Sequence, residues 1–165
     1  MPYDAVLFWF RRDLRCDDNA GLFAALQQAR AVHCVFVFDS EILEKLTQRR
    51  DRRVEFVWHS VRDLQRDLRA LGGDLYVLHG AAQELIPRLA IQLGVGAVFI
   101  NHDYEPTAIR RDDRVQAALG ASGVALHTFK DQVVFEKNEV LTQAGKPYSV
   151  FTPYKNAWLA QVNAF

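Results

Sequence analysis

Five short apolar runs, separated by longer segments with helical periodicity, are the feature that most constrains how this chain can fold. The runs are Ala5–Phe10, Ala31–Phe38, Leu75–Leu78, Ala97–Ile100 and Val124–Leu126. Several are rich in Val, Phe and Ile, as strands buried on both faces are. Because parallel strands need a crossover segment between them, strands that alternate with helices indicate an α/β fold with a parallel sheet.

The segments between the runs repeat apolar residues every three or four positions, as helices that cover a sheet do. The clearest stripe consists of Val54, Val57, Trp58, Val61, Leu64, Leu68 and Leu71. We expect all of these side chains in the core. Shorter patterns begin near Leu22, near Leu85, where Pro87 predicts a kink or a late start, and at Pro106. We therefore predict a Rossmann-like, doubly wound sheet of five parallel strands with helices on both faces in residues 1–130.

The pattern changes after residue 130. Residues 131–165 begin with short apolar groups and a turn sequence at Ala144–Pro147, which predict an irregular arm. A helical pattern then begins at Tyr154 and is still incomplete at Phe165. We therefore expect the natural chain to continue after this residue.

Composition narrows the possible classes of function. The 165 residues are 50% hydrophobic, which is enough for one substantial core. The 20 Lys and Arg residues balance the 20 Asp and Glu residues, so we expect only weak DNA binding by this chain itself. No apolar run is long enough to span a membrane and no secretory signal is recognisable, which predicts a cytoplasmic protein without a membrane partner. We expect the chain to be a monomer. Cys16 and Cys34 are isolated, so we expect reduced thiols and no metal site.

Polar residues follow several of the predicted strands. The strand ends carry Phe10-Arg11-Arg12-Asp13, Phe38-Asp39-Ser40, His79-Gly80 and Asn101-His102-Asp103-Tyr104-Glu105. In an open parallel sheet, ligands bind outside the carboxyl ends of the strands, at the point where the strand order reverses. Aromatic rings, carboxylates and guanidinium groups should therefore meet at one edge. Such an edge suits a flat heteroaromatic ligand with polar rims.

The same residues also have a simpler interpretation, in which they stabilise the fold and bind no ligand. Arg11, Arg12 and Arg15 can form an ion-pair network with neighbouring carboxylates, and we assign Arg12 to that network. Asp39 can serve only as a helix cap. The arginine-rich run at residues 49–53 favours a solvated helix entrance over a phosphate site. No serine has an apparent base and orienting acid, so nucleophilic hydrolysis is not supported.

Two separated segments carry a family resemblance. The sequence WFRRDLR at residues 9–15, with Asp18-Asn19 after it, resembles the opening motif of the DNA photolyase/cryptochrome family. The sequence YSVFTPYKNAW at residues 148–158 resembles the second landmark of that family. The resemblance implies that this chain is the amino-terminal α/β domain, which holds a light-harvesting antenna chromophore. It also implies that residues 131–165 lead to a helical domain, absent here, that holds the catalytic FAD.

The resemblance extends to the antenna pocket. In family members that bind a deazaflavin, a strand-end aspartate, an arginine at the start of the long helix and a D-x-E-P segment line this pocket, and they match Asp39, Arg53 and Asp103-Tyr104-Glu105-Pro106. Thr107-Ala108 replaces both the Tyr-Gly of those members and the Asn-Glu common in folate-binding members. The resemblance therefore implies a deazaflavin or an FMN-like chromophore rather than methenyltetrahydrofolate, with an empty site as the alternative.

The strand-end rule and the resemblance together define the predicted chromophore site. It consists of Arg11, Phe38, Asp39, Arg53, Asp103 and Glu105. The carboxylates should accept hydrogen bonds from ring N–H or ribityl hydroxyl groups, the arginines should donate, and the phenylalanine should pack on the ring.

The resemblance implies a function for the whole protein rather than for this chain alone. It implies a photolyase that cleaves cyclobutane pyrimidine dimers in damaged DNA with blue light, and this chain without its FAD domain is expected to be inactive. A cryptochrome photoreceptor shares the same domain and is an alternative. A stand-alone nucleotide-binding module shares only the sheet, and it would carry a Gly-rich loop near the fourth strand, where residues 101–106 have none.

Overall fold

The computed structural model describes residues 1–48 and 50–162. Within the chain there are two compact units, Met1–Asp131 and Gln132–Phe165, and each is described by itself. Among the described residues, no helix combines the length and the apolar character needed to cross a membrane.

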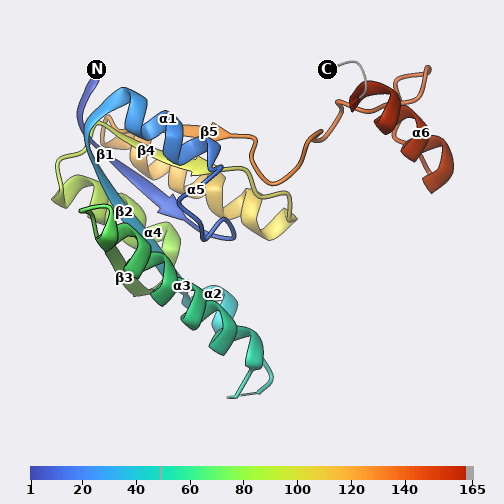
Figure 1. The fold of residues 1–165 in the computed structure, drawn as a ribbon. Coiled ribbons are helices and arrows are strands. Elements are labelled where there is room, and N and C mark those ends of the chain that lie inside the picture. The colour runs from blue at the N-terminus through green and yellow to red at the C-terminus, as the bar shows by residue number, and fades with distance from the viewer. Residues whose placement is uncertain (49, 163–165) are drawn as a thin grey trace. The chain divides into compact units, whose positions relative to one another are not determined.

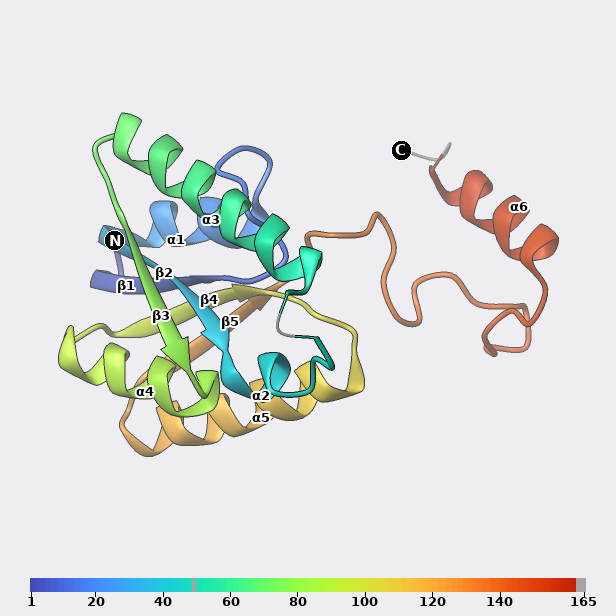
Figure 2. The ribbon, with the colours of Figure 1, turned by 90° about the horizontal axis from the view of Figure 1, so that it is seen from below.

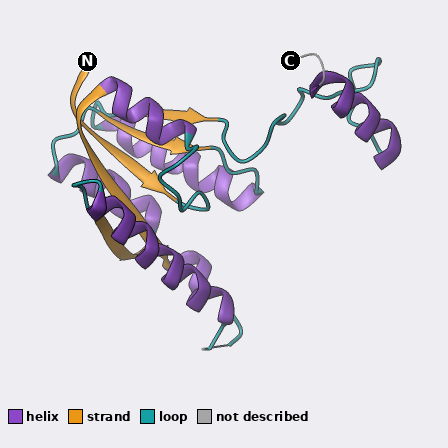
Figure 3. Cartoon of the chain, viewed as in Figure 1, coloured by secondary structure: helices purple, strands orange, loops and turns teal. Residues whose placement is uncertain are grey.

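The first unit is built on a sheet of five parallel strands (Figures 1 and 3). The strands are β1 (Tyr3–Phe10), β2 (Ala29–Asp39), β3 (Leu75–Gly80), β4 (Ala97–Asn101) and β5 (Ala125–Phe129). Their order across the sheet is β3-β2-β1-β4-β5, and every neighbouring pair is parallel. The order reverses between β1 and β4, as in a doubly wound sheet. The predicted number and direction of strands are thus confirmed.

Helices cover both faces of this sheet, as predicted (Figure 2). They are α1 (Ala20–Gln28), α3 (Arg52–Ala70), α4 (Ala82–Gln92) and α5 (Pro106–Ala121). Figure 2 shows α1 and α3 on one face and α4 and α5 on the other. Successive side chains of β1 alternate between the two layers, because Val6 and Phe8 pack with α1 and α3 while Leu7 and Trp9 pack with α4 and α5.

Two helical features differ from the sequence prediction. A short helix, α2 (Ser40–Leu43), directly follows β2 and was not predicted. Helix α4 begins at Ala82 and contains Pro87, which excludes the late start, one of the two alternatives for this proline. Ile86 and Leu89 lie on the buried side of α4 with Pro87 itself, and this packing offsets the hydrogen bond that the proline cannot donate.

The apolar stripe of α3 is narrower in the structure than in the sequence. Val61, Leu64 and Leu68 are buried against the sheet, as predicted. Trp58 is 46% exposed and Leu71 is 75% exposed, so their predicted core positions are wrong. Trp58 lies at the margin of the stripe, where the helix surface turns away from the sheet. Leu71 is the C-cap residue and lies beyond the last residue of α3.

Both cysteines of the first unit are free thiols. Cys34 is buried in β2, and this burial raises the pKa of its thiol to about 12. Cys34 therefore remains protonated and poorly reactive at neutral pH.

The second unit is an irregular segment followed by one helix. Residues 132–150, all of them described, form turns and bends without a helix or strand, which agrees with the predicted irregular course. Helix α6 (Phe151–Val162) begins three residues before the predicted start at Tyr154. Within this unit the rings of Phe135 and Trp158 lie 5.8 Å apart, and Gln161 Nε2 donates to the carbonyl oxygen of Glu139 over 3.0 Å.

Candidate functional site

Two adjoining pockets lie at the carboxyl ends of β1, β2 and β4. The first, of about 420 Å³, is walled by Trp9 and Phe36 from the strands and by Thr107 and Ala108 from α5, and we call it the strand-end pocket. The second, of about 270 Å³, lies between α2 and α3, and we call it the α2 pocket. Lining residues common to both include Arg11, Phe36, Val37, Asp39, Ile42 and Leu46. The pockets therefore meet beside the point where the strand order reverses.

The structure brings the predicted chromophore-site residues together at these pockets. Arg11 and Asp39 line both of them. Asp103 and Glu105 line the strand-end pocket, and the other two predicted residues, Phe38 and Arg53, line the α2 pocket. This convergence follows from the topology, because parallel neighbouring strands end at the same edge of the sheet.

Arg11 is fixed by contacts within the protein. Its guanidinium, 7% exposed, donates from Nη1 to Asp112 Oδ2 over 2.6 Å and from Nη2 to the carbonyl oxygen of Asn101. It also lies 5.2 Å from the centre of the Trp9 ring, and Arg111 lies 4.9 Å from the same ring. Trp9, Asp112 and the Asn101 carbonyl therefore hold Arg11 in place. Trp9, Arg11 and Arg111 form one charged and aromatic wall of the strand-end pocket.

Asp39 has a structural role in addition to its place in the pockets. It caps α2, because its Oδ1 accepts from the backbone N–H of Glu41 over 3.1 Å. The same oxygen lies 3.4 Å from the backbone nitrogen of Ala82, which donates to it at the start of α4. The helix-cap interpretation of Asp39 is thus correct. Both hydrogen bonds use Oδ1, so a ligand of this carboxylate would use Oδ2.

Arg12 belongs to the site rather than to a separate structural network. Its Nε lies 3.5 Å from Asp103 Oδ2, and its Nη2 donates to Glu105 Oε1. Arg12 also lines the strand-end pocket. The predicted ion pairing is present, but its partners are two of the predicted site carboxylates. A substitution of Arg12 would therefore remove a partner from both of these carboxylates.

Arg53 is held at the entrance of α3. Asp51 caps this helix through Oδ1, which accepts from the backbone N–H of Arg53 over 2.8 Å. The same carboxylate pairs with the Arg53 side chain, with 2.6 Å between Nη2 and Oδ2. Hydrogen bonds from Arg53 lower the pKa of Asp51 to about 2. The predicted donor in the α2 pocket is thus largely engaged by a neighbouring carboxylate.

A buried polar network behind the pockets fixes the ends of β1 and β4. Asn19 caps α1, because its Oδ1 accepts from the backbone N–H of Leu22 over 3.0 Å. Asn101 Nδ2 donates to that same oxygen over 2.9 Å and also to Asp13 Oδ2, while its Oδ1 accepts from the Gly21 N–H over 2.8 Å. These contacts connect the last residue of β4 to the loop after β1.

Sequence reasoning missed several residues that line the strand-end pocket. Trp9 belongs to the first predicted strand, and its buried ring also forms part of the pocket wall. Arg111 and Lys45 also line this pocket. Helical spacing from Pro106 could have found Arg111, because positions 107, 108 and 111 share one side of a helix that begins there. Among the described residues, no cluster of three or more His, Cys, Asp or Glu could hold a metal ion.

The fold is an open α/β domain with adjoining pockets at the carboxyl edge of its sheet. The chain belongs to the DNA photolyase family, whose model matches residues 6–164. It is 38% identical over 156 residues to a deoxyribodipyrimidine photo-lyase of Synechococcus, covering 94% of this chain and 32% of that protein. The chain thus spans about a third of the length of this curated relative.

Solved structures of the family share the fold. A class III photolyase from Agrobacterium tumefaciens superposes with a TM-score of 0.81 at 28% identity, covering 93% of this chain and 31% of that one. An archaeal photolyase from Sulfolobus tokodaii, described with two FAD molecules, superposes with a TM-score of 0.78 at 29% identity. That alignment covers 92% of this chain and 34% of the archaeal one.

Proposed function

We propose that this chain is the antenna domain of a photolyase that cleaves cyclobutane pyrimidine dimers in DNA. In this proposal the pyrimidine dimer is bound and cleaved by a helical FAD domain in the same polypeptide, and residues 131–165 form the arm that leads to it. The observation that carries the proposal is the convergence of Asp39, Asp103 and Glu105 on adjoining pockets at the sheet edge of a photolyase-family domain.

The proposed ligand of these pockets is a flavin-like antenna chromophore. Phe36 and Val37 offer an apolar surface to a flat ring, and the carboxylates of Asp103 and Glu105 offer acceptors to ring N–H or ribityl hydroxyl groups. Thr107 and Ala108 put only small side chains at the pocket wall. The second FAD molecule of the Sulfolobus tokodaii photolyase supports a flavin as the class of chromophore.

Substitution of Asp103 tests the proposed chromophore site. We expect the wild-type chain to quench the fluorescence of FMN on binding, and Asp103→Ala to weaken that binding by roughly ten- to a hundredfold, the usual cost of a lost hydrogen bond to a charged group. Asp113→Ala is the matched control, because Asp113 is an exposed residue of α5 away from the pockets. Equal FMN affinity of wild type and Asp103→Ala would place the chromophore elsewhere.

The chain alone should not repair DNA. In this proposal the chain binds only the light-harvesting chromophore. The group that would transfer an electron to the dimer belongs to the helical domain. Irradiation of the purified chain with dimer-containing DNA should therefore leave the amount of dimer unchanged, as measured by chromatography of the digested DNA. A light-dependent loss of dimer, relative to a dark sample, would contradict this assignment.

A further inference from the structure

Trp9 lies in the wall of the strand-end pocket, directly beside the proposed chromophore site. It is 2% exposed and packs with apolar residues of α4 and α5. An indole ring that touches an excited flavin can give up one electron to it. The indole then becomes a radical cation, the flavin holds the extra electron, and the excitation energy is lost as heat when this electron returns. A tryptophan in this wall would therefore quench an antenna chromophore unless its environment opposes the loss of an electron.

Two guanidinium groups lie against the Trp9 ring. The central carbon of the Arg111 guanidinium is 4.9 Å from the ring centre, and that of Arg11 is 5.2 Å away. Both distances are within the range at which a cation and an aromatic ring attract each other. Positive charge this close opposes oxidation of the ring, because both groups would repel the radical cation. Trp9 should therefore be harder to oxidise than an indole in water.

Burial strengthens the effect of these two charges. The side chains of Arg11 and Arg111 are 7% and 11% exposed, so water screens their charges poorly. Asp112 pairs with both, with 2.6 Å between its Oδ2 and Arg11 Nη1 and 3.0 Å between its Oδ1 and Arg111 Nη2. In the part of the chain that the structure describes, no other carboxylate pairs with either guanidinium. One buried positive charge is thus left over beside the ring, and ion pairing accounts for only one of the two arginines.

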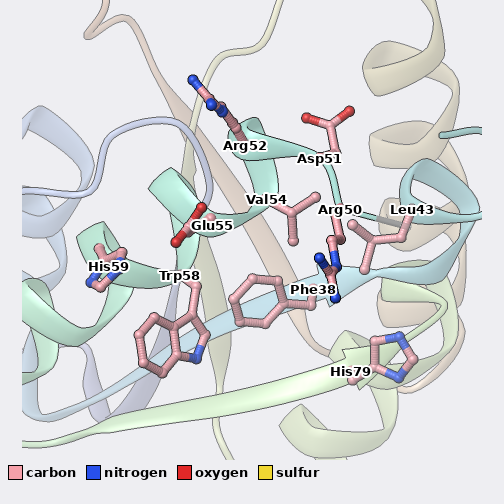
Figure 4. Close-up of a pocket in the computed structure, with 10 residues that line it drawn as sticks. All are labelled: Phe38, Leu43, Arg50, Asp51, Arg52, Val54, Glu55, Trp58, His59 and His79. Carbon is pink, nitrogen blue, oxygen red and sulfur yellow. The ribbon is translucent and has the colours of Figure 1, made fainter. Parts of the chain in front are cut away.

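A second tryptophan of the same unit lacks this environment. Trp58 lines a larger pocket of about 850 Å³ at the start of α3, where its ring lies next to that of Phe38 (Figure 4). One guanidinium, that of Arg62, is 4.7 Å from its ring centre, and Trp58 is 46% exposed. Because water screens that single charge, Trp58 should be oxidised more readily than Trp9. Of the tryptophans that the structure describes, only the one beside the proposed chromophore site has two guanidinium groups at its ring.

We propose that Arg11 and Arg111 raise the oxidation potential of Trp9 and thereby protect the excited state of the bound antenna chromophore from loss by electron transfer. The effect of the arginines on Trp9 rests on the geometry of the pocket wall alone. Its consequence for light harvesting rests on the proposed function, since it requires a flavin-like chromophore in the strand-end pocket. Asp112 is the positioning residue that holds both guanidinium groups at the ring.

The fluorescence lifetime of bound FMN tests this protection. Arg111→Gln should shorten the lifetime about three- to tenfold beyond the quenching that accompanies binding to the wild type, because it removes a unit charge close to the ring. Arg111→Lys keeps the charge and should recover much of the wild-type lifetime. The lifetimes are measured at saturating FMN, so that a change in affinity does not enter. Arg110→Gln is the matched control, because Arg110 is an exposed residue of α5 outside the pocket wall.

A double variant identifies the residue that quenches. Trp9→Phe combined with Arg111→Gln removes both the electron donor and the charge, and it should restore the wild-type lifetime. An unchanged lifetime in Arg111→Gln would overturn the protective role. A short lifetime that persists in the double variant would overturn it as well, because the electron would then come from another residue.

Oxidation of the chain without a chromophore tests the arginines separately from the flavin site. An azide radical becomes an azide ion by taking one electron from an indole, and mass spectrometry of the digested chain then gives the oxidised fraction at Trp9 and at Trp58. Arg111→Gln should raise this fraction at Trp9 at least about threefold and leave it unchanged at Trp58. Arg111→Lys should behave like the wild type, which separates the charge from the access of the radical.

The two measurements have distinguishable outcomes. Easier oxidation of Trp9 in Arg111→Gln, in a chain that does not bind FMN, would support the effect of the arginines and overturn the flavin site. An oxidised fraction at Trp9 that is the same in the wild type and in Arg111→Gln would overturn the effect of the arginines, whether or not FMN binds.

Discussion

Replacement of Gly21 by alanine should lower the free energy of unfolding by about 2–4 kcal/mol, the combined cost of overpacking and of a weakened buried hydrogen bond. A Cβ atom at this position would lie 2.6 Å from Asn101 Oδ1 and 2.9 Å from Phe8 Cε2. Neither neighbour can move freely, because Phe8 is fully buried and Asn101 is 2% exposed. Urea denaturation followed by circular dichroism measures the change.

Gly120→Ala is the control for this substitution. Gly120 lies inside α5, and a Cβ atom there would have no neighbour within 4 Å. Alanine favours a helix over glycine, so this variant should be more stable than wild type by about 0.5–1 kcal/mol. The two Gly→Ala changes should therefore have opposite signs. A Gly21→Ala variant as stable as wild type would mean that α1 can move away from Asn101 without loss.

Asn101→Ala should lower the free energy of unfolding further, by about 3–5 kcal/mol. The amide of Asn101 donates to Asp13 and Asn19 and accepts from the backbone N–H of Gly21. Alanine leaves the buried N–H of Gly21 without an acceptor and removes one of the donors to Asp13. Asp13 and Asn19, the two side chains that remain in the network, are both buried. Thermal and urea unfolding should both report the loss.

Asn156→Ala provides the comparison for Asn101→Ala, because Asn156 is an exposed residue of α6. Its effect should stay within about 0.5 kcal/mol, as is usual for surface substitutions. If Asn101→Ala were equally mild, water would have to replace the amide in the network. In that case the network would not be what fixes the end of β4 to the loop after β1.

The sheet and its covering helices could be predicted from sequence because they depend on periodicity. The strands appear as short apolar runs, and α3 appears as a stripe through Val61, Leu64 and Leu68. Helix α2 could not be found in this way, since four residues are barely one turn and show no period. The exposure of Trp58 could not be predicted from sequence either. Periodicity shows which way a helical side chain points, but it does not show how wide the surface is that covers the helix.

The location of the candidate site was predictable, whereas the partners of its charged residues were not. Strand ends of a parallel sheet must meet, so Asp39 and Asp103 were placed together correctly. Arg11, however, pairs with Asp112, which is 101 positions away and had drawn no attention in the sequence. Long flexible side chains can reach several carboxylates in such a crevice, and only the packed arrangement decides which of them is used.

The buried network and the pocket lining belong to different sets of side chains. Asp13, Asn19 and Asn101 hold the strand ends from behind, while Thr107 and Ala108 stand on the first turn of α5 at the pocket wall. The residues that line the pocket can therefore change while the buried network that fixes the strand ends stays the same. One inherited scaffold could in this way acquire different chromophores, and with them different colours of absorbed light, by changes at a few positions that leave its folding almost untouched.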